Sequence, residues 1–339
     1  METKTNIFFH APKELTTDAF LVWFIYFLDS DKKYRRKKQL FFDRIILKKE
    51  DCGRKVCQIE LKRQENNVDV LLSFYFEDSD EKQMVLFEDK IWSMPHSNQL
   101  ALYRKRYPNC YRYFYYKLGY INTQEEQEVT REQYDIINAG MMSAVTEKCV
   151  KLHPLIKMYD DYITYTFGES QRGFYEKLFV NHDYDILWDA DAQKYLCDTI
   201  VENMTEQQVP YLEIRNGSSF GRPWTQIDIA EKKHGYWEKL FWRVDIRSGK
   251  FYVRLNQYAE PSKDEVPYKT QRLEILRKEA NNLVANMPDL HPGKVHDRAV
   301  KESEVVIFFL EDNNLETLIE AIPKISSRMI KVFKNLETR

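Results

Sequence analysis

The feature that most constrains the fold is a pair of apolar segments, one followed directly by acidic residues and the other containing one. Met84-Val85-Leu86-Phe87 continues into Glu88-Asp89-Lys90, and the apolar run from Val68 to Leu72 is interrupted by Asp69. Both segments have the composition of buried β-strands. A carboxylate in a buried strand is costly unless a partner compensates its charge. The fold must therefore bring such a partner to Asp69 and Glu88.

Strand geometry predicts that these side chains converge on one point. Glu88 and Lys90 are two residues apart, so they lie on the same face of a strand, and hairpin pairing would bring Asp69 beside Glu88. Two carboxylates with a lysine suit phosphodiester cleavage, in which a divalent cation neutralises the phosphate and generates a hydroxide. We expect Asp69 and Glu88 to bind the cation, with the backbone carbonyl of Asp89 as a third ligand and Lys90 orienting the attacking water.

The spacing Glu-x-Lys alone is a weak signal because it recurs in Glu2 with Lys4, Glu60 with Lys62, and Glu231 with Lys233. The pair Glu60 and Lys62 also ends an apolar run. A helix after Lys90 separates the candidate from these pairs: Gln99 and Tyr103 are four apart and His96 is three before Gln99, so all three share one helical face. His96 has an alternative interpretation as a helix-start residue.

The first part of the chain has the pattern of an α/β domain. The expected order is a helix, three strands, a helix and a strand, with further helical segments from Thr130 to Lys151. The ranges are Pro12 to Leu28 for the first helix, Val56 to Leu61, Val68 to Phe76 and Met84 to Phe87 for the strands, Ser97 to Tyr107 for the second helix, and Tyr111 to Tyr120 for the last strand. This order predicts a mixed sheet flanked by helices.

The second part has the pattern of an α+β region. Residues 207–258 alternate as strands do, with turns expected at Asn216-Gly217 and Ser248-Gly249. The last eighty or so residues indicate helices separated by a strand from Val305 to Leu310. We place the boundary near residue 155, which gives a core at 1–155 and a C-terminal region of unknown role at 156–339, possible functions being substrate or partner recognition.

Composition limits the class of protein. Apolar residues make up 43% of the chain and charged residues 31%, which indicates a folded globular protein. The 51 basic and 53 acidic residues nearly balance, so attraction to nucleic acid requires local patches. The five cysteines lack a C-x-x-C pair, and the longest apolar run, Ala19 to Leu28, is about half of a bilayer span. We therefore expect a cytoplasmic protein without a disulfide framework, a zinc site or a membrane segment.

With these motifs in place, residues 6–107 resemble the PD-(D/E)XK nuclease superfamily, specifically bacterial proteins with a V-D-V strand, an E-D-K strand and a Q-x-x-x-Y helix. Here those motifs are Val68-Asp69-Val70, Glu88-Asp89-Lys90, and Gln99 with Tyr103, preceded by the segment Lys13 to Phe20. The resemblance implies a restriction-endonuclease-like αβββαβ core, Mg²⁺ or Mn²⁺ as cofactor, and DNA as substrate in defence or repair. It also implies an acid from the first helix at the metal site, either Glu14 or Asp18. Val68 replaces the proline that gives the superfamily its name.

Two alternatives stay open at the level of sequence. In the first, this chain retains the nuclease fold as a nucleic-acid-binding or protein-interaction module without independent catalysis; in the second, catalysis occurs only when a partner delivers the substrate, and a protein partner or homodimer is compatible with the chain. Candidate binding surfaces mix cations with aromatic rings. They are Lys32 to Lys38, Tyr103 to Tyr107 with Tyr111 to Tyr113, Phe220 to Trp224, and Trp237, Phe241, Trp242 and Arg243. Each is also compatible with an ordinary solvated or core role.

Overall fold

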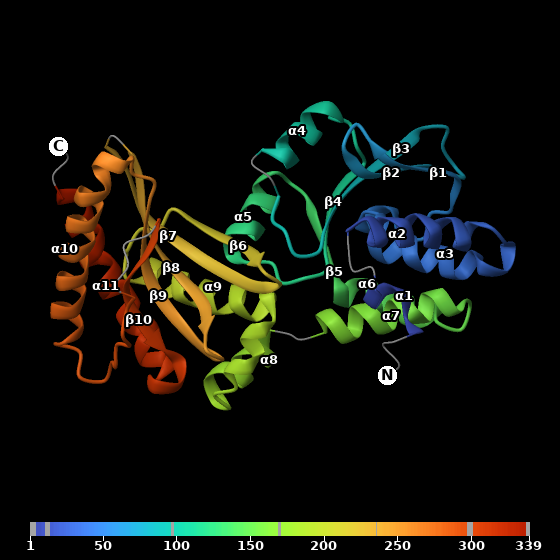
Figure 1. Ribbon diagram of the computed structural model, residues 1–339. Helices are drawn as coiled ribbons and strands as arrows, with labels where there is room; N and C mark the ends of the chain where they lie inside the picture. Colours follow the sequence, from blue (N-terminus) through green and yellow to red (C-terminus); the bar gives the residue numbers. More distant parts are fainter. Residues whose placement is uncertain are drawn as a thin grey trace. The chain divides into compact units, whose positions relative to one another are not determined.

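The chain folds into two compact units, Met1–Ser170 and Gln171–Arg339 (Figure 1). The computed structural model describes residues 5–10, 14–95, 98–168, 171–234, 236–296 and 301–336. The division falls after the boundary expected near residue 155, because Pro154 begins a helix of the first unit. This helix, α7 (Pro154–Phe167), packs against α1 (Ile7–His10) and α6 (Ala139–Thr146). Proline at the first helical position starts a helix readily, so Pro154 does not mark a linker.

The first unit contains a five-stranded sheet in the order β1-β2-β3-β4-β5. Strands β1 (Val56–Glu65), β2 (Val68–Phe76) and β3 (Lys82–Lys90) form an antiparallel meander, and β4 (Arg112–Lys117) and β5 (Asp135–Asn138) follow in parallel. The helices are α2 (Glu14–Asp29), α3 (Arg35–Phe41), α4 (Gln99–Arg106) and α5 (Thr123–Arg131), besides α1, α6 and α7. A π-helical segment, Phe42–Ile46, continues α3.

The order α2, β1, β2, β3, α4, β4 is the one expected from the sequence, and the α/β class with a mixed sheet is confirmed. The helical segments expected from Thr130 to Lys151 include the end of α5 and all of α6, but the strand β5 between these helices was not expected. This strand has only four residues, and its pairing with β4 stabilises it. So short an apolar segment carries too little periodicity to be recognised as a strand.

Two hydrophobic cores cover the two faces of the first sheet. Successive residues of a strand point to opposite faces, and β3 follows this rule: Val85 and Phe87 join the larger core, whereas Leu86 joins the smaller one. Helix α2 supplies Phe20, Leu21, Phe24, Ile25 and Leu28 to the larger core, as its dense apolar composition predicts. Helices α4 and α5 contribute Leu100, Tyr103 and Val129 to the smaller core. Strand β3 is thus buried on both sides.

The second unit is built on an antiparallel sheet in the order β10-β9-β8-β7-β6. The strands are β6 (Glu213–Ser219), β7 (Arg222–His234), β8 (Tyr236–Arg247), β9 (Lys250–Ala259) and β10 (Glu302–Phe309). The helices are α8 (Gln171–Tyr175), α9 (Ala190–Glu206), α10 (Val266–Val284) and α11 (Leu315–Asn335), and a π-helical segment, Glu176–Val180, follows α8. The α+β expectation for this region agrees with the structure.

One of the two expected turns is present in the second unit. Ser248 and Gly249 have φ of 53° and 83°, as a tight hairpin between β8 and β9 requires. The turn expected at Asn216-Gly217 is wrong, because both residues lie inside β6 and the chain turns at Phe220-Gly221 instead. A Cβ atom on Gly217 would come within 2.6 Å of the Trp224 ring, so this glycine allows a close side-chain contact.

In the described part of the chain, no helix has the length and apolar character needed to cross a membrane.

We predict that Gly217→Ala destabilises the protein by about 1 kcal/mol or more, because the rigid indole ring of Trp224 must move to admit the new methyl group. The matched control is Gly140→Ala in α6, where the added Cβ meets its neighbour at an ordinary 3.4 Å and alanine favours the helix. Urea unfolding followed by circular dichroism measures both variants. Equal stabilities for the two variants would contradict the packing role of Gly217.

Candidate active site

The structure brings Asp69 and Glu88 together at the adjoining ends of β2 and β3. The pairing of β2 with β3 ends at Val70 and Phe87, and Asp69 and Glu88 are the next residues of the two strands. Their carboxyl groups lie close together on one face of the sheet, because the charge of Asp69 and a side-chain hydrogen bond with it both raise the pKa of Glu88. The Asp69 Oδ2 atom also accepts a hydrogen bond of 2.8 Å from the Asp89 backbone N–H. The convergence expected from strand geometry is therefore present.

Glu88 is fully buried and is held by two donors. Its Oε1 atom accepts from Lys90 Nζ in a short ion pair and from Gln99 Nε2 at 2.7 Å. Lys90 Nζ also lies 3.2 Å from the carbonyl oxygen of Asp89. The Glu88 Oε2 atom has no hydrogen-bond partner among the described residues, although it is shielded from solvent. Thus Oε1 of Glu88 accepts two hydrogen bonds, whereas Oε2 accepts none from the described residues.

Helix α4 connects this carboxylate to the β1–β2 hairpin. Gln99 Nε2 donates to the Tyr103 hydroxyl at 3.0 Å, and that hydroxyl donates to the backbone carbonyl of Asn67. Asn66 and Asn67 form the hairpin turn with φ of 55° and 68°, a conformation that asparagine tolerates well. The face of α4 that was expected to contact the site does so: Gln99 donates to Glu88, and Tyr103 bonds to Gln99. His96 lies outside the described residues, as do Pro12 and Lys13.

The acidic residues of α2 lie near the site, in different positions. The Glu14 Oε1 atom accepts from Ser93 Oγ at 2.8 Å and from the Ile91 backbone N–H at 3.4 Å. Asp18 is buried and accepts from Gln64 Nε2 at 3.3 Å. The structure therefore places Glu14 on the segment after β3 and Asp18 close to the carboxylate of Asp69.

The Asp89 side chain points away from Glu88 and Lys90, into the face of the sheet that α2 covers. It is 1% exposed, it couples with the carboxyl of Asp18, and neither of its oxygens has a hydrogen-bond partner of normal geometry within the described residues. Strand alternation requires this direction, since Asp89 lies between Glu88 and Lys90. Only the backbone carbonyl of Asp89 faces Lys90. This carbonyl oxygen is the atom of Asp89 that we expected to bind the metal.

Burial controls the protonation of the acidic groups. Burial and the nearby Asp69 raise the pKa of Glu88 to about 8, against the opposing effect of Lys90. Burial and Asp69 raise the pKa of Asp18 to about 6, and burial with Asp18 raises the pKa of Asp89 well above its usual range. Burial alone would lower the pKa of Lys90, but the ion pair with Glu88 outweighs it, so that pKa is raised and the ammonium stays charged. The site thus has an excess of carboxyl groups that a cation would help to ionise.

The oxygen atoms of the site fit a hard divalent cation better than a soft one. Asp69 and Glu88 supply carboxylate oxygens, the ligands that Mg²⁺ prefers, and the buried Glu88 Oε2 lacks another partner. The arrangement is not a complete metal cage: within the described ranges, no three His, Cys, Asp or Glu side chains are grouped so as to hold a metal ion. A small ligand set is usual for Mg²⁺, which keeps several waters and binds substrate phosphate.

Sequence reasoning missed two parts of the site. Gln64 Nε2 bridges Asp18 and Asp69, at 3.3 Å and 3.1 Å. Lys117, fully buried on β4, forms a 2.8 Å ion pair with Glu125 and donates to the Ser93 carbonyl at 2.6 Å. A lysine within an aromatic strand was a usable signal, because a buried ammonium requires a carboxylate partner. Gln64 gave no signal, since its position depends on the local backbone at φ 53°.

The competing Glu-x-Lys pairs do not form comparable sites. Glu60 and Lys62 are exposed on the edge strand β1, where they pair with Lys82 at 3.4 Å and with Glu65 at 3.1 Å. Glu231 is exposed on β7 and accepts from the Trp237 indole at 3.4 Å. Glu2 and Lys4 lie outside the described residues. Neither described pair consists of a buried glutamate with a second carboxylate beside it, as Glu88 has in Asp69.

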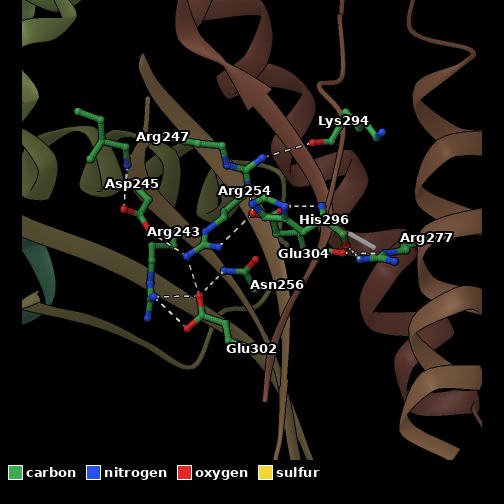
Figure 2. A network of polar contacts seen from close by, with 11 residues as sticks. Arg243, Asp245, Arg247, Arg254, Asn256, Arg277, Lys294, His296, Glu302 and Glu304 are labelled. Atoms are coloured by element: carbon green, nitrogen blue, oxygen red, sulfur yellow. Dashed lines mark hydrogen bonds and ion pairs between the residues drawn. The ribbon is translucent and has the colours of Figure 1, made fainter. Parts of the chain in front are cut away.

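The second unit carries a separate charged network on β8, β9 and β10 (Figure 2). Arg243 and Arg254 both bind Glu302, at 2.9 Å and 2.7 Å, and Arg254 also binds Asp245 at 2.8 Å. Arg243 stacks on Trp224, with 4.8 Å from the guanidinium carbon to the ring centroid. Of the aromatic residues proposed as a binding surface, Phe241 and Trp242 are each 1% exposed, and the Trp242 indole donates to Ser326. These two are core residues.

Comparison with protein-family models, with curated proteins and with solved structures gives no match for this chain.

We predict that Asp89→Asn raises the free energy of unfolding of the metal-free protein at pH 7. The folded state holds Asp89 protonated, whereas the unfolded chain releases its proton above the ordinary aspartate pKa, so the wild type loses stability as pH rises through the neutral range. Asparagine keeps the shape and removes this loss. Chemical unfolding at a series of pH values between about 4 and about 8 measures the effect.

The matched control for this measurement is Asp80→Asn, an exposed aspartate in the connection between β2 and β3. Its variant should follow the wild-type pH profile throughout. A variant Asp89→Asn with the same decline in stability toward high pH as the wild type would show that Asp89 is ionised in the folded protein.

Proposed function

We propose that this protein is a divalent-metal-dependent nuclease, with Asp69, Glu88 and Lys90 as its catalytic group. The observation that carries the proposal is the side-by-side placement of Asp69 and Glu88 on neighbouring strands, with the Lys90 ammonium on Glu88. The αβββαβ order around the mixed sheet supports a restriction-endonuclease-like core. Hydrolysis of a phosphodiester bond requires this combination of anionic ligands and a nearby cation.

The roles follow from the contacts of each side chain. Asp69 and the open Oε2 atom of Glu88 would hold Mg²⁺ or Mn²⁺, with the Asp89 carbonyl beside them. The bound cation supplies charge neutralisation at the phosphate and lowers the pKa of a water. Lys90 is the hydrogen-bond donor closest to these oxygens and would orient that water. Gln99 and Tyr103 position Glu88, because they connect it to the hairpin turn.

DNA is the proposed substrate, on the basis of the resemblance and of local charge. The last turn of α4 carries Arg104, Lys105 and Arg106, immediately after Tyr103. Cations at this position would attract a phosphate backbone to the acidic strand ends, although the chain as a whole is nearly neutral. Glu14 and Asp18 are the candidates for the acid from the first helix, and the position of Asp18 beside Asp69 favours Asp18.

We predict that the purified protein cleaves plasmid or single-stranded DNA with Mg²⁺ or Mn²⁺ and loses this activity in a chelator. Glu88→Gln and Asp69→Asn should each lower the rate by about a hundredfold or more, because each removes a metal ligand while keeping the side-chain shape. The matched control is Glu60→Gln, which changes the exposed Glu-x-Lys pair on β1 and should cleave as the wild type does. Wild-type rates in Glu88→Gln would refute the assignment.

Metal binding is predicted independently of cleavage. Isothermal titration with Mn²⁺ should give one site in the wild type at pH 8 and weaker binding at pH 6, because protons compete for a Glu88 carboxyl whose pKa is about 8. The Glu88→Gln variant should lose this binding. Mn²⁺ and DNA binding without any cleavage would favour the alternative, a nuclease fold that serves as a binding module.

A further inference from the structure

A cavity of about 710 Å³ lies in the first unit, away from the acidic strand ends. Its lining includes Arg112, the first residue of β4, whereas Lys90 is the last residue of β3. In the parallel pairing of these strands, Arg112 lies opposite Val85 and Lys117 opposite Lys90. Five residues of strand therefore separate the two levels, roughly 16 Å along the sheet. The cavity is a depression that is widely open to solvent, with a volume in the range of small-molecule pockets.

The lining carries more positive than negative charge. It contains four cations, Lys48, Lys49, Arg104 and Arg112, and two carboxylates, Asp43 and Asp135. Both carboxylates are already engaged: Asp135 forms a 3.0 Å ion pair with Arg112, and Asp43 accepts from Gly53 N–H at 2.8 Å. Arg112 in turn donates to the Leu47 carbonyl at 3.0 Å. These contacts hold the lining in place, and they neutralise one of the four cations, Arg112.

The remaining three cations, Lys48, Lys49 and Arg104, have no carboxylate within ion-pair distance in the part of the chain that the structure describes. Arg104 Nη1 donates to the backbone carbonyls of Glu132 and Gln133 at 3.2 Å and 3.3 Å, which leaves its Nε and Nη2 for an anion. Aromatic rings fix two of them in place: Lys48 Nζ lies 4.8 Å from the Tyr111 ring centroid, and the Arg104 guanidinium lies 4.4 Å from that of Tyr113. Ordered, unneutralised cations in one hollow are a preorganised anion site.

We propose that this cavity binds a phosphate-bearing small molecule of nucleotide size. Phosphate is the anion that an arginine fork and two ammonium groups bind best, and the guanidinium of Arg104 can donate bidentately. The tyrosine rings and Leu47 give an apolar wall against which the rest of the ligand packs. The cavity lies at the other end of β3 and β4 from the acidic strand ends, although α4 borders both through Tyr103 and Arg104, and ligand binding there does not depend on nuclease activity.

The test uses adenosine monophosphate and inorganic phosphate as probes, measured by isothermal titration without divalent metal. The exposed thiol of Cys52 lines the cavity and reports occupancy, because a bound ligand slows its alkylation. We expect adenosine monophosphate to bind and to protect Cys52 several-fold, and adenosine, which lacks the phosphate, to do neither. Cys57 on β1 lies outside the lining and should react at an unchanged rate.

Matched charge variants identify the residues. Arg104→Gln should weaken binding of adenosine monophosphate by about tenfold or more, as expected for loss of charge-assisted hydrogen bonds. Lys49→Gln, which removes an exposed cation, should weaken it about threefold. Lys105→Gln removes the same charge one residue beyond Arg104, outside the lining, and should bind as the wild type does.

Three outcomes would overturn the proposal: no protection of Cys52 by adenosine monophosphate, equal protection by adenosine, or unchanged affinity in both Arg104→Gln and Lys49→Gln. A 5′-phosphorylated oligonucleotide tests the other source of phosphate. If it protects Cys52 and the mononucleotide does not, the cavity receives nucleic acid, and the proposal of a small-molecule ligand fails. Cleavage assays are not needed for any of these outcomes.

Discussion

The buried ion pair between Glu88 and Lys90 is the interaction on which the rest of the first unit depends. A carboxylate without solvent exposure is tolerated only where donors surround it, and here the donors come from its own strand and from α4. Gln99 reaches Glu88 only because Tyr103 ties α4 to the hairpin between β1 and β2. A helix, a hairpin and two strand ends therefore meet around one side chain.

The sequence allowed this centre to be located because its residues violate the local pattern. Asp69 and Glu88 stand where apolar residues are expected, and the strand β2 observed at Val68–Phe76 has the bounds that its composition predicts. Alternation along β3 then required Glu88 and Lys90 to share a face. The meander, the α4 face with Gln99 and Tyr103, and the helices flanking β10 follow from periodicity in the same way.

Other features depend on tertiary contacts that no local pattern encodes. Asn216 and Gly217 have the composition of a turn, but the Trp224 ring requires a glycine within the strand. Strand β5 is stabilised by its partner β4, and the first unit continues through α7 because that helix packs on α1 and α6. Gln64 joins two aspartates only after the chain has curved at φ 53°. The roles of these residues could not be predicted from the sequence, because they depend on contacts that form only in the folded protein.

Strand β3 pairs antiparallel with β2 and parallel with β4, and this difference affects the order in which the strands of the sheet come together. The β1–β2–β3 meander needs only short loops, whereas β4 must return through the crossover that contains α4. Short-range pairings close sooner than crossovers, because less chain entropy is lost. On this order, Glu88 would stay hydrated until the crossover docks and Gln99 of α4 donates to its carboxyl. Release of this crossover would therefore expose the ends of β2 and β3 to water again.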